Sequence, residues 1–121
     1  MPKRPVAVVI GDDTDIRELI VTVLRMCGCV VHAADSADGV GSVRLFGPDI
    51  TILDTGYGDT DGVETARKIR AFSDAYILVL TTHPGARAAA KGLTAVGHML
   101  KPFRVDELRT HVRSVLDVAP D

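Results

Sequence analysis

Four polar positions in this sequence carry side chains that could act together on a phosphoryl group. They are the acidic pair Asp12-Asp13, the carboxylate of Asp54, the hydroxyl of Thr81 and the ammonium group of Lys101. Carboxylates held close together repel one another and favour a bound cation, and Mg²⁺ is a hard ion that prefers oxygen ligands. A carboxylate beside such an ion can attack a phosphoryl group to form an aspartyl phosphate. Lysine and hydroxyl groups can stabilise the charge that spreads over the transferred oxygens.

Each of these positions closely follows a short apolar run that predicts a β-strand. Val6–Ile10 is continuous and β-branched, which is typical of a strand covered on both faces. Further strands are predicted at about residues 29–33, 50–53, 77–80 and 95–100. Apolar residues spaced three and four apart predict helices at about residues 16–27, 36–46, 63–72, 86–93 and 105–116. Ser36 is the predicted cap of the second helix.

Five alternating strand–helix units predict an α/β fold with helices on both faces of a parallel sheet. Right-handed crossovers favour a flavodoxin-like, doubly wound sheet of five strands in the order 2-1-3-4-5, with five helices. Ligands bind such sheets at the carboxyl ends of the strands, so the four polar positions should meet at one edge. The whole chain, residues 1–121, is predicted to form one domain with no separate effector domain.

The composition excludes several classes of protein. Hydrophobic residues make up 46% and charged residues 25% of the chain, as in ordinary globular domains. The net charge is −2 with both signs interspersed, so no nucleic-acid partner is expected. Because no apolar run is long enough to cross a membrane or to form a signal peptide, we expect a cytoplasmic protein without a membrane partner. Cys27 and Cys29 are expected to be buried thiols rather than a metal or redox pair.

Taken singly, the polar positions have simpler interpretations. An aspartate after a strand is commonly a turn residue or a helix cap. Thr81 alone would be a hydroxyl at a strand end, and Lys101 alone a surface charge. Their joint occurrence at the ends of the expected strands favours a shared chemical role.

With these residues in this order, the sequence resembles the receiver domains of two-component response regulators over essentially its whole length. The motifs that carry the resemblance are Asp12-Asp13, Asp54, Asp61-Gly62, Thr81 and Lys101-Pro102-Phe103. It implies a stand-alone phosphoprotein of signal transduction that accepts a phosphoryl group on Asp54 from a histidine kinase or a histidine phosphotransfer protein. Such a domain is not an enzyme in the usual sense, because it catalyses only its own phosphorylation and dephosphorylation.

The resemblance also implies how the site is built. Mg²⁺ would be the cofactor, held by Asp13, Asp54 and the backbone carbonyl of Gly56, with Asp12 acting through water. Lys101 would contact the phosphoryl group.

Two further roles follow from the same resemblance. Thr81 would move toward the phosphoryl group, and the bond between Lys101 and Pro102 would be cis. Phosphorylation would change the surface formed by the fourth helix, fifth strand and fifth helix, through which a downstream protein binds. Whether the domain forms a homodimer through that surface stays open.

Some positions depart from the family pattern. The loop after Asp54 carries Tyr57-Gly58 in place of Met-Pro, and His98 stands where the family has an aromatic switch residue. His98 is either a half-exposed residue at a strand end or a switch that moves inward and adds pH sensitivity. Gly56 and His83 occupy positions that influence the lifetime of the aspartyl phosphate in similar proteins.

Two other functions are compatible with parts of the pattern. The departures at residues 57, 58 and 98 would suit a receiver-like interaction module that no longer switches on phosphorylation. A small Mg²⁺-dependent phosphatase with an aspartyl nucleophile is disfavoured, because Asp54 is followed by Thr55-Gly56 rather than by an Asp-x-Asp sequence.

Overall fold

The computed structural model describes residues 4–54, 60–82, 85, 88 and 90–116; at residues 60 and 61 it describes the backbone alone. Strands and helices alternate along these residues as the apolar periodicity predicted, except between β4 and β5, where part of the chain lies outside the described residues. The strands are β1 (Val6–Ile10), β2 (Val30–Ala34), β3 (Ile50–Asp54), β4 (Tyr76–Thr81) and β5 (Val96–Leu100). The helices are α1 (Thr14–Met26), α2 (Gly39–Phe46), α3 (Thr60–Arg70) and α5 (Val105–Leu116).

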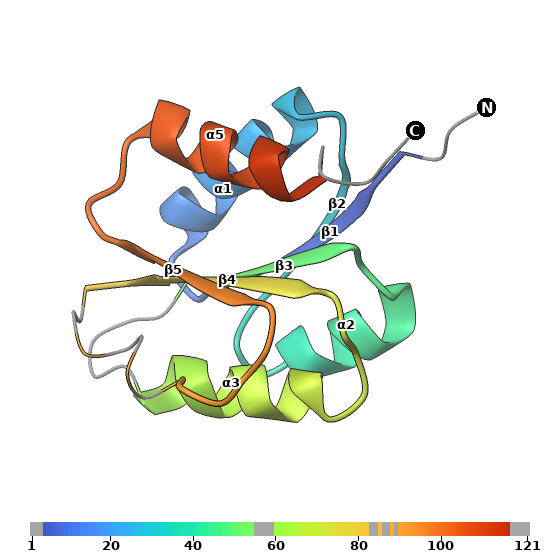
Figure 1. The fold of residues 1–121 in the computed structure, drawn as a ribbon. Helices are drawn as coiled ribbons and strands as arrows, with labels where there is room; N and C mark the ends of the chain where they lie inside the picture. The colour runs from blue at the N-terminus through green and yellow to red at the C-terminus, as the bar shows by residue number, and fades with distance from the viewer. Residues whose placement is uncertain (1–3, 55–59, 83–84, 86–87, 89, 117–121) are drawn as a thin grey trace.

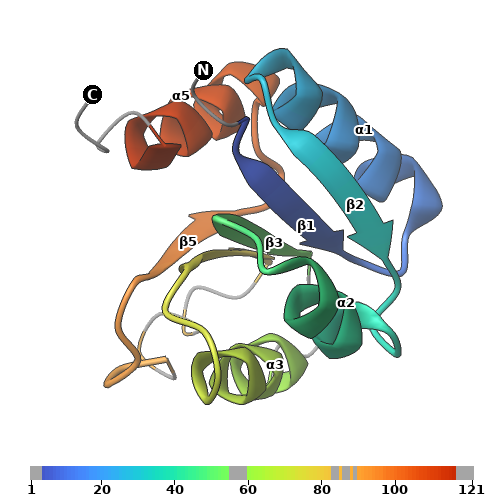
Figure 2. The ribbon, with the colours of Figure 1, turned by 90° about the vertical axis from the view of Figure 1, so that its right-hand side faces the viewer.

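The five strands form one parallel sheet in the predicted order β2-β1-β3-β4-β5. Figures 1 and 2 show α1 and α5 on one face of the sheet and α2 and α3 on the other. Successive residues of a strand point to opposite faces, so Ala7 and Val9 join the core under α1 and α5, whereas Val8 and Ile10 join the core over α2 and α3. Burial on both faces explains why the three central strands, β1, β3 and β4, are nearly continuous apolar runs, whereas the edge strands β2 and β5 are more exposed.

The described residues contain four of the five predicted helices. Of the helix predicted at residues 86–93, Ala88 is helical and turns follow, with the amide of Lys91 donating to the carbonyl of Ala88 and that of Leu93 to the carbonyl of Ala90. Gly92 has a φ of 97°, which no α-helix accommodates. Residues 86, 87 and 89 of the predicted helix lie outside the described part.

The second helix begins later than predicted. It starts at Gly39, after Asp38, so Ser36 is not its cap. An added Cβ at Gly39 would lie only 2.6 Å from a methyl carbon of Ile10, which shows how closely the start of α2 approaches β1. Ser36 instead hydrogen-bonds Asp12, an interaction described below.

Within the described ranges, we find no helix of the length and apolar character that crossing a membrane requires.

Candidate functional site

The register of the sheet brings the predicted site residues to its carboxyl edge. Ile10 pairs with Leu53, so Gly11 comes level with Asp54 at the next position. Asp54 pairs with Leu80, and the amide of Lys101 donates to the carbonyl of Thr81 at 2.8 Å. Residues that lie more than 40 positions apart in the sequence therefore meet at the carboxyl edge of four neighbouring strands, β1, β3, β4 and β5.

Asp54 and Lys101 form the central contact of this edge. The ammonium group of Lys101 donates to Oδ1 of Asp54 at 2.6 Å, and the side chains are 15% and 4% exposed respectively. A charge-assisted hydrogen bond of this length is short and strong, and a nearly buried carboxylate needs such a partner. Lys101 is followed by Pro102 through a cis peptide bond. Asp54 is thus a carboxylate with little access to water and with one oxygen already oriented by a cation.

Gly11 leaves space beside the other oxygen of Asp54. A Cβ at Gly11 would lie 3.1 Å from Cβ of Asp54 and 3.4 Å from its Oδ2. Any larger residue would press on the acid, so the absence of a side chain keeps this approach open. No chemical motif in the sequence marks Gly11 as a site residue. The only signal was a glycine between a strand and an acidic pair.

Asp12 is held by the loop between β2 and α2. The backbone amide of Ser36 donates to Oδ1 of Asp12 at 2.8 Å, and the Ser36 hydroxyl donates to Oδ2 at 2.7 Å. These two hydrogen bonds, the amide first, lower the pKa of Asp12 below its ordinary value, and the positive charge of Arg17 adds to the effect. Asp12 is exposed and ionised, with both oxygens engaged.

Asp13 caps the first helix. Its Oδ1 accepts a hydrogen bond of 3.0 Å from the amide of Ile16, which is the N-cap interaction of α1. Arg17, one turn into this helix, donates to the carbonyl of Gly11 at 2.8 Å. Two contacts from α1, one to the side chain of Asp13 and one to the carbonyl of Gly11, therefore fix the short loop that follows β1.

The chemistry of these residues fits Mg²⁺, although the described side chains do not form a ready ligand set. In the ranges that the structure describes, no three His, Cys, Asp or Glu side chains lie close enough together to hold a metal ion. Asp12 and Asp13 are exposed, and Gly11 carries no side chain that would press on Oδ2 of Asp54. Carboxylate oxygens are the donors that Mg²⁺ takes. The predicted carbonyl ligand, Gly56, lies outside the described residues.

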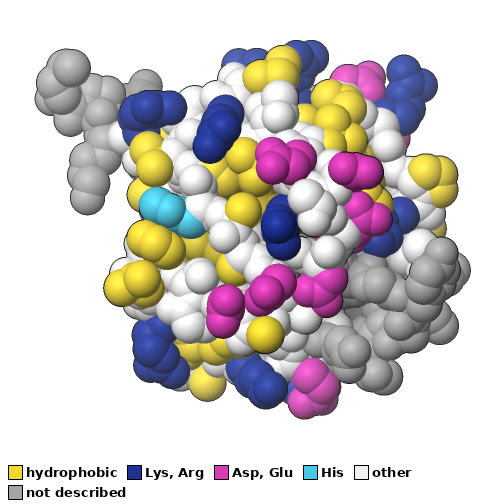
Figure 3. Space-filling view, turned by 180° about the vertical axis from the view of Figure 1, so that it is seen from behind, with side chains coloured by type: hydrophobic (Ala, Val, Ile, Leu, Met, Phe, Trp, Pro, Cys, Tyr) yellow, Lys and Arg dark blue, Asp and Glu magenta, His cyan; other side chains and the backbone are white. Residues whose placement is uncertain are grey.

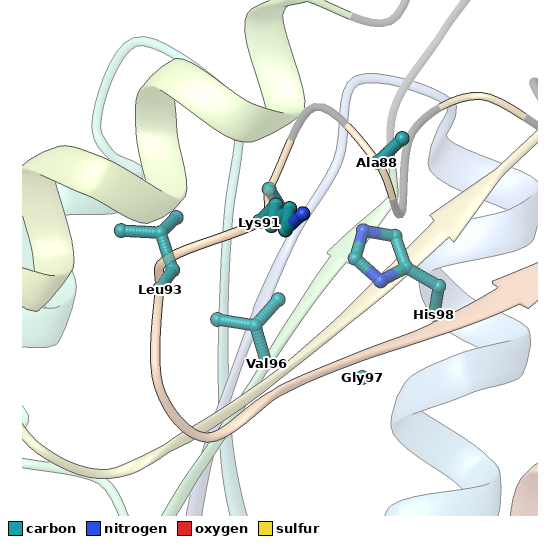
Figure 4. A pocket seen from close by; sticks show the side chains of 7 residues that line it. Ala88, Lys91, Leu93, Val96, Gly97 and His98 are labelled. Atoms are coloured by element: carbon teal, nitrogen blue, oxygen red, sulfur yellow. The ribbon is translucent and has the colours of Figure 1, made fainter.

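Thr81 lies on β4, next to the strand that ends at Asp54, and His98 lies on β5 beyond it. Thr81 is 1% exposed at the end of β4. His98 is half-buried and pairs with Val79 in the middle of β5, not at a strand end. Its ring extends toward Ala88 and Lys91 and lines a hollow of about 610 Å³ (Figure 4). His83 and Tyr57-Gly58 lie outside the described residues.

The other side of β5 carries a second histidine contact. The Tyr76 hydroxyl lies 2.8 Å from Nε2 of His111 on α5, and it occupies the space that a side chain at Gly97 would need. Burial lowers the pKa of His111 below its ordinary value. This contact joins the sheet to α5, and the tautomer of His111 decides which of the two groups donates.

Comparison with known proteins identifies relatives of this chain by sequence. TrcR of Mycobacterium tuberculosis, a transcriptional regulatory protein, is 33% identical over 118 residues, which cover 93% of this chain and 46% of that protein. The transcriptional regulatory protein KdpE of Staphylococcus aureus is 32% identical over 114 residues, which cover 92% of this chain and 49% of KdpE. The chain thus spans about half the length of the curated relatives that it matches.

Solved structures share the fold. The chemotaxis protein CheY4 of Vibrio cholerae superposes with a TM-score of 0.81 at 24% identity, covering 93% of this chain and 99% of CheY4. The signal receiver domain of the response regulator NarL from Mycobacterium tuberculosis also superposes with a TM-score of 0.81 at 24% sequence identity, covering 98% of this chain and all of that domain. The family described as the response regulator receiver domain matches residues 7–113. With the parallel sheet, its strand order and this match in agreement, the chain belongs to the response regulator receiver domain family.

Proposed function

We propose that Asp54 accepts a phosphoryl group from a histidine kinase or a histidine phosphotransfer protein, and that the phosphorylated domain changes its affinity for a downstream protein. Receiver domains are phosphoacceptor signalling domains of two-component systems that interact with histidine kinases, and they generally use Mg²⁺. The observation that carries the assignment is the nearly buried Asp54, with Lys101 on one oxygen and the open space of Gly11 beside the other.

This geometry suggests how the transfer proceeds. Oδ2 of Asp54 attacks phosphorus while the bond from phosphorus to the donor breaks, and the donor leaves with the electron pair. Lys101 keeps Asp54 oriented and then balances the charge of the transferred oxygens. Asp12, Asp13, Asp54 and the carbonyl of Gly56 would hold Mg²⁺, which neutralises phosphoryl charge when bound.

A response to phosphorylation requires a contact that differs between two states. Thr81 and Lys101 lie beside Asp54 on adjacent strands and would bind the added charge best in one arrangement of the nearby loops. We propose that the change reaches the surface of the predicted fourth helix, β5 and α5, where the downstream protein binds. His83 remains a proposed determinant of phosphoryl lifetime, which His83→Ala would test.

His98 favours a second candidate, a receiver-like interaction module that does not switch. Its ring already faces the hollow beside Lys91, so no inward movement has to follow phosphorylation (Figure 4). Partner affinity that is the same for phosphorylated and unphosphorylated protein would support this candidate. A phosphorylated-state affinity that changes between pH 6 and 8 would support the pH-sensitive switch instead.

We propose that this domain does not contact nucleic acid itself, although two relatives are named as the DNA-binding response regulator MtrA. The chain spans about half of those proteins. On the face seen in Figure 3, Lys and Arg side chains are scattered among acidic and hydrophobic ones rather than gathered into a basic patch.

Intact mass after incubation with acetyl phosphate and Mg²⁺ tests the acceptor chemistry. Wild type should gain the mass of one phosphoryl group, and the gain should require Mg²⁺. Asp54→Ala should show no gain. An equal gain in Asp54→Ala would refute the assignment.

A further inference from the structure

We propose that Ser36 is a positioning residue that competes with a divalent cation for Asp12, so that cation binding is coupled to the loop between β2 and α2. The inference rests on the proposed function, because it takes Asp12 as part of the cation site. It assigns a role to a loop on the far side of the acidic pair from the surface expected to bind downstream proteins.

The contact between Ser36 and Asp12 uses both oxygens of the carboxylate. The amide reaches Oδ1 at 2.8 Å and the hydroxyl reaches Oδ2 at 2.7 Å. Such a two-point contact fixes the plane of the carboxylate as well as its direction. In this orientation Asp12 does not join Asp13 and Asp54 in a ligand set within the described residues. A cation that takes an oxygen of Asp12 directly, rather than through water, must therefore reorient the carboxylate against these hydrogen bonds.

The loop is built to present both donors. The backbone amide of Asp38 donates a hydrogen bond of 2.9 Å to Oδ1 of Asp35, and this bond closes a turn that contains Ser36. The helix that follows cannot move inward, because Gly39 already lies against Ile10. When Asp12 is released from Ser36, the conformation of residues 35–38 should therefore change, whereas α2 should stay in place.

The contact is weak enough to be reversible. Asp12 and Ser36 are both exposed, so water can replace each hydrogen bond when it breaks. Arg17, on the α1 side, donates to the Gly11 carbonyl at 2.8 Å. Arg17 thus anchors the backbone of the Asp12 loop while Ser36 holds only the side chain. The carboxylate can turn without unfolding the loop that carries it.

Removal of the Ser36 hydroxyl should therefore tighten cation binding. We expect Ser36→Ala to lower the dissociation constant for Mg²⁺ by about three- to tenfold, the change produced by one hydrogen bond of ordinary net strength. Ser36→Thr keeps the hydroxyl and should return the affinity to that of wild type. Ser114→Ala is a matched control, since its hydroxyl bonds the His111 carbonyl on α5 and should leave the affinity unchanged.

Mg²⁺ titrations of the full chain, followed by calorimetry and by amide chemical shifts, provide the test. In wild type the amide proton of Ser36 should move upfield as Mg²⁺ saturates the site, because it loses the carboxylate acceptor. Tighter binding in Ser36→Ala together with this shift supports the competition. Unchanged or weaker binding in folded Ser36→Ala, or a Ser36 amide that does not respond, overturns it.

The proposal about Ser36 and the proposal about Asp54 fail separately. Phosphoryl gain on Asp54 with no change of Mg²⁺ affinity in Ser36→Ala refutes only the role of Ser36. A changed Mg²⁺ affinity without phosphoryl gain on Asp54 refutes only the acceptor assignment.

Discussion

Asp54 and the pair Asp12-Asp13 lie at the same edge of the sheet and are held in opposite ways. Asp54 is nearly buried and its partner, Lys101, comes from a strand end 47 residues away. Asp12 and Asp13 are exposed and are held by a nearby loop and by the start of their own helix. The group expected to form a covalent bond is fixed by the fold, whereas the groups expected to bind a cation can be rearranged.

The energies of these contacts explain the difference. Breaking a buried ion pair by removing one partner typically costs about 3–5 kcal/mol, because a charge is left without compensation. Hydrogen bonds exposed to water contribute only about 0.5–1.5 kcal/mol each, since water replaces the lost partner. The site therefore combines a rigid acceptor with adaptable carboxylates. The predictions below test this contrast, beginning with the largest expected effect.

Removing the ammonium group of Lys101, which pairs with Asp54, should reduce the stability of the fold more than any other change considered. Lys101→Met should lower the free energy of unfolding by about 2–3 kcal/mol, somewhat less than for a fully buried pair because the Lys101 side chain is 15% exposed. Urea denaturation at pH 7 measures the effect. Lys91→Met, on an exposed turn, is the control and should change stability by less than about 0.5 kcal/mol. A Lys101→Met protein as stable as wild type would contradict the view that Asp54 is held rigidly.

The second-largest effect is expected from a side chain at Gly11, which would crowd the phosphoryl acceptor Asp54. Gly11→Ala places a Cβ 3.1 Å from Cβ of Asp54 and should cost about 1–2 kcal/mol of stability through overpacking. Phosphorylation by acetyl phosphate should slow severalfold. Gly41→Ala in α2 is the matched control: its Cβ meets nothing within 4 Å, and it should stabilise the helix. Unaltered phosphorylation kinetics in Gly11→Ala would show that this space is not an approach to Asp54.

Asp13 should separate the structural role of a carboxylate from its role toward Mg²⁺. Asp13→Ala should lose about 1 kcal/mol because α1 loses its N-cap, whereas Asp13→Asn keeps a capping oxygen and should retain most of the stability. Both variants should bind Mg²⁺ more weakly, since both lack the charge. Thermal denaturation and Mg²⁺ calorimetry on the pair give the two readouts. Wild-type Mg²⁺ affinity in Asp13→Asn would exclude Asp13 from the cation site.

The smallest expected effect lies away from this edge, at His111. Burial lowers the pKa of His111 in the folded state, so below about pH 6.5 the unfolded chain takes up a proton more readily than the folded chain. Stability should therefore fall as the pH decreases from 6.5 and level off below the folded-state pKa. His111→Gln, which cannot titrate there, should show a shallower loss between pH 7.5 and 5.5 in urea denaturation. An identical pH dependence in both proteins would remove His111 from the explanation.

The sequence predicted the sheet well, because strands buried on both faces leave continuous apolar runs. It also predicted that Asp54, Thr81 and Lys101 gather at one edge, since parallel strands end together. The prediction that Ser36 caps the second helix was wrong. A serine before an apolar periodic segment is a common helix cap, and only the folded loop shows that its hydroxyl donates to Asp12 instead. The turn at residues 90–93 was not predicted, because an Ala-rich run favours a helix locally, whereas Gly92 takes a left-handed conformation.

The role of Gly11 could not be seen in the sequence for a similar reason. Its importance depends on the register between β1 and β3, which places it level with Asp54. Register between strands 40 residues apart is set by packing across the sheet, not by neighbouring residues.

Chemical mapping of the phosphoryl group tests the contrast between the three aspartates most directly. After treatment with acetyl phosphate and Mg²⁺, borohydride reduces an aspartyl phosphate to homoserine, which tandem mass spectrometry of the digested protein can locate. The account predicts homoserine at residue 54 and unmodified aspartate at residues 12 and 13. Homoserine at residue 12 or 13, with residue 54 unmodified, would contradict it.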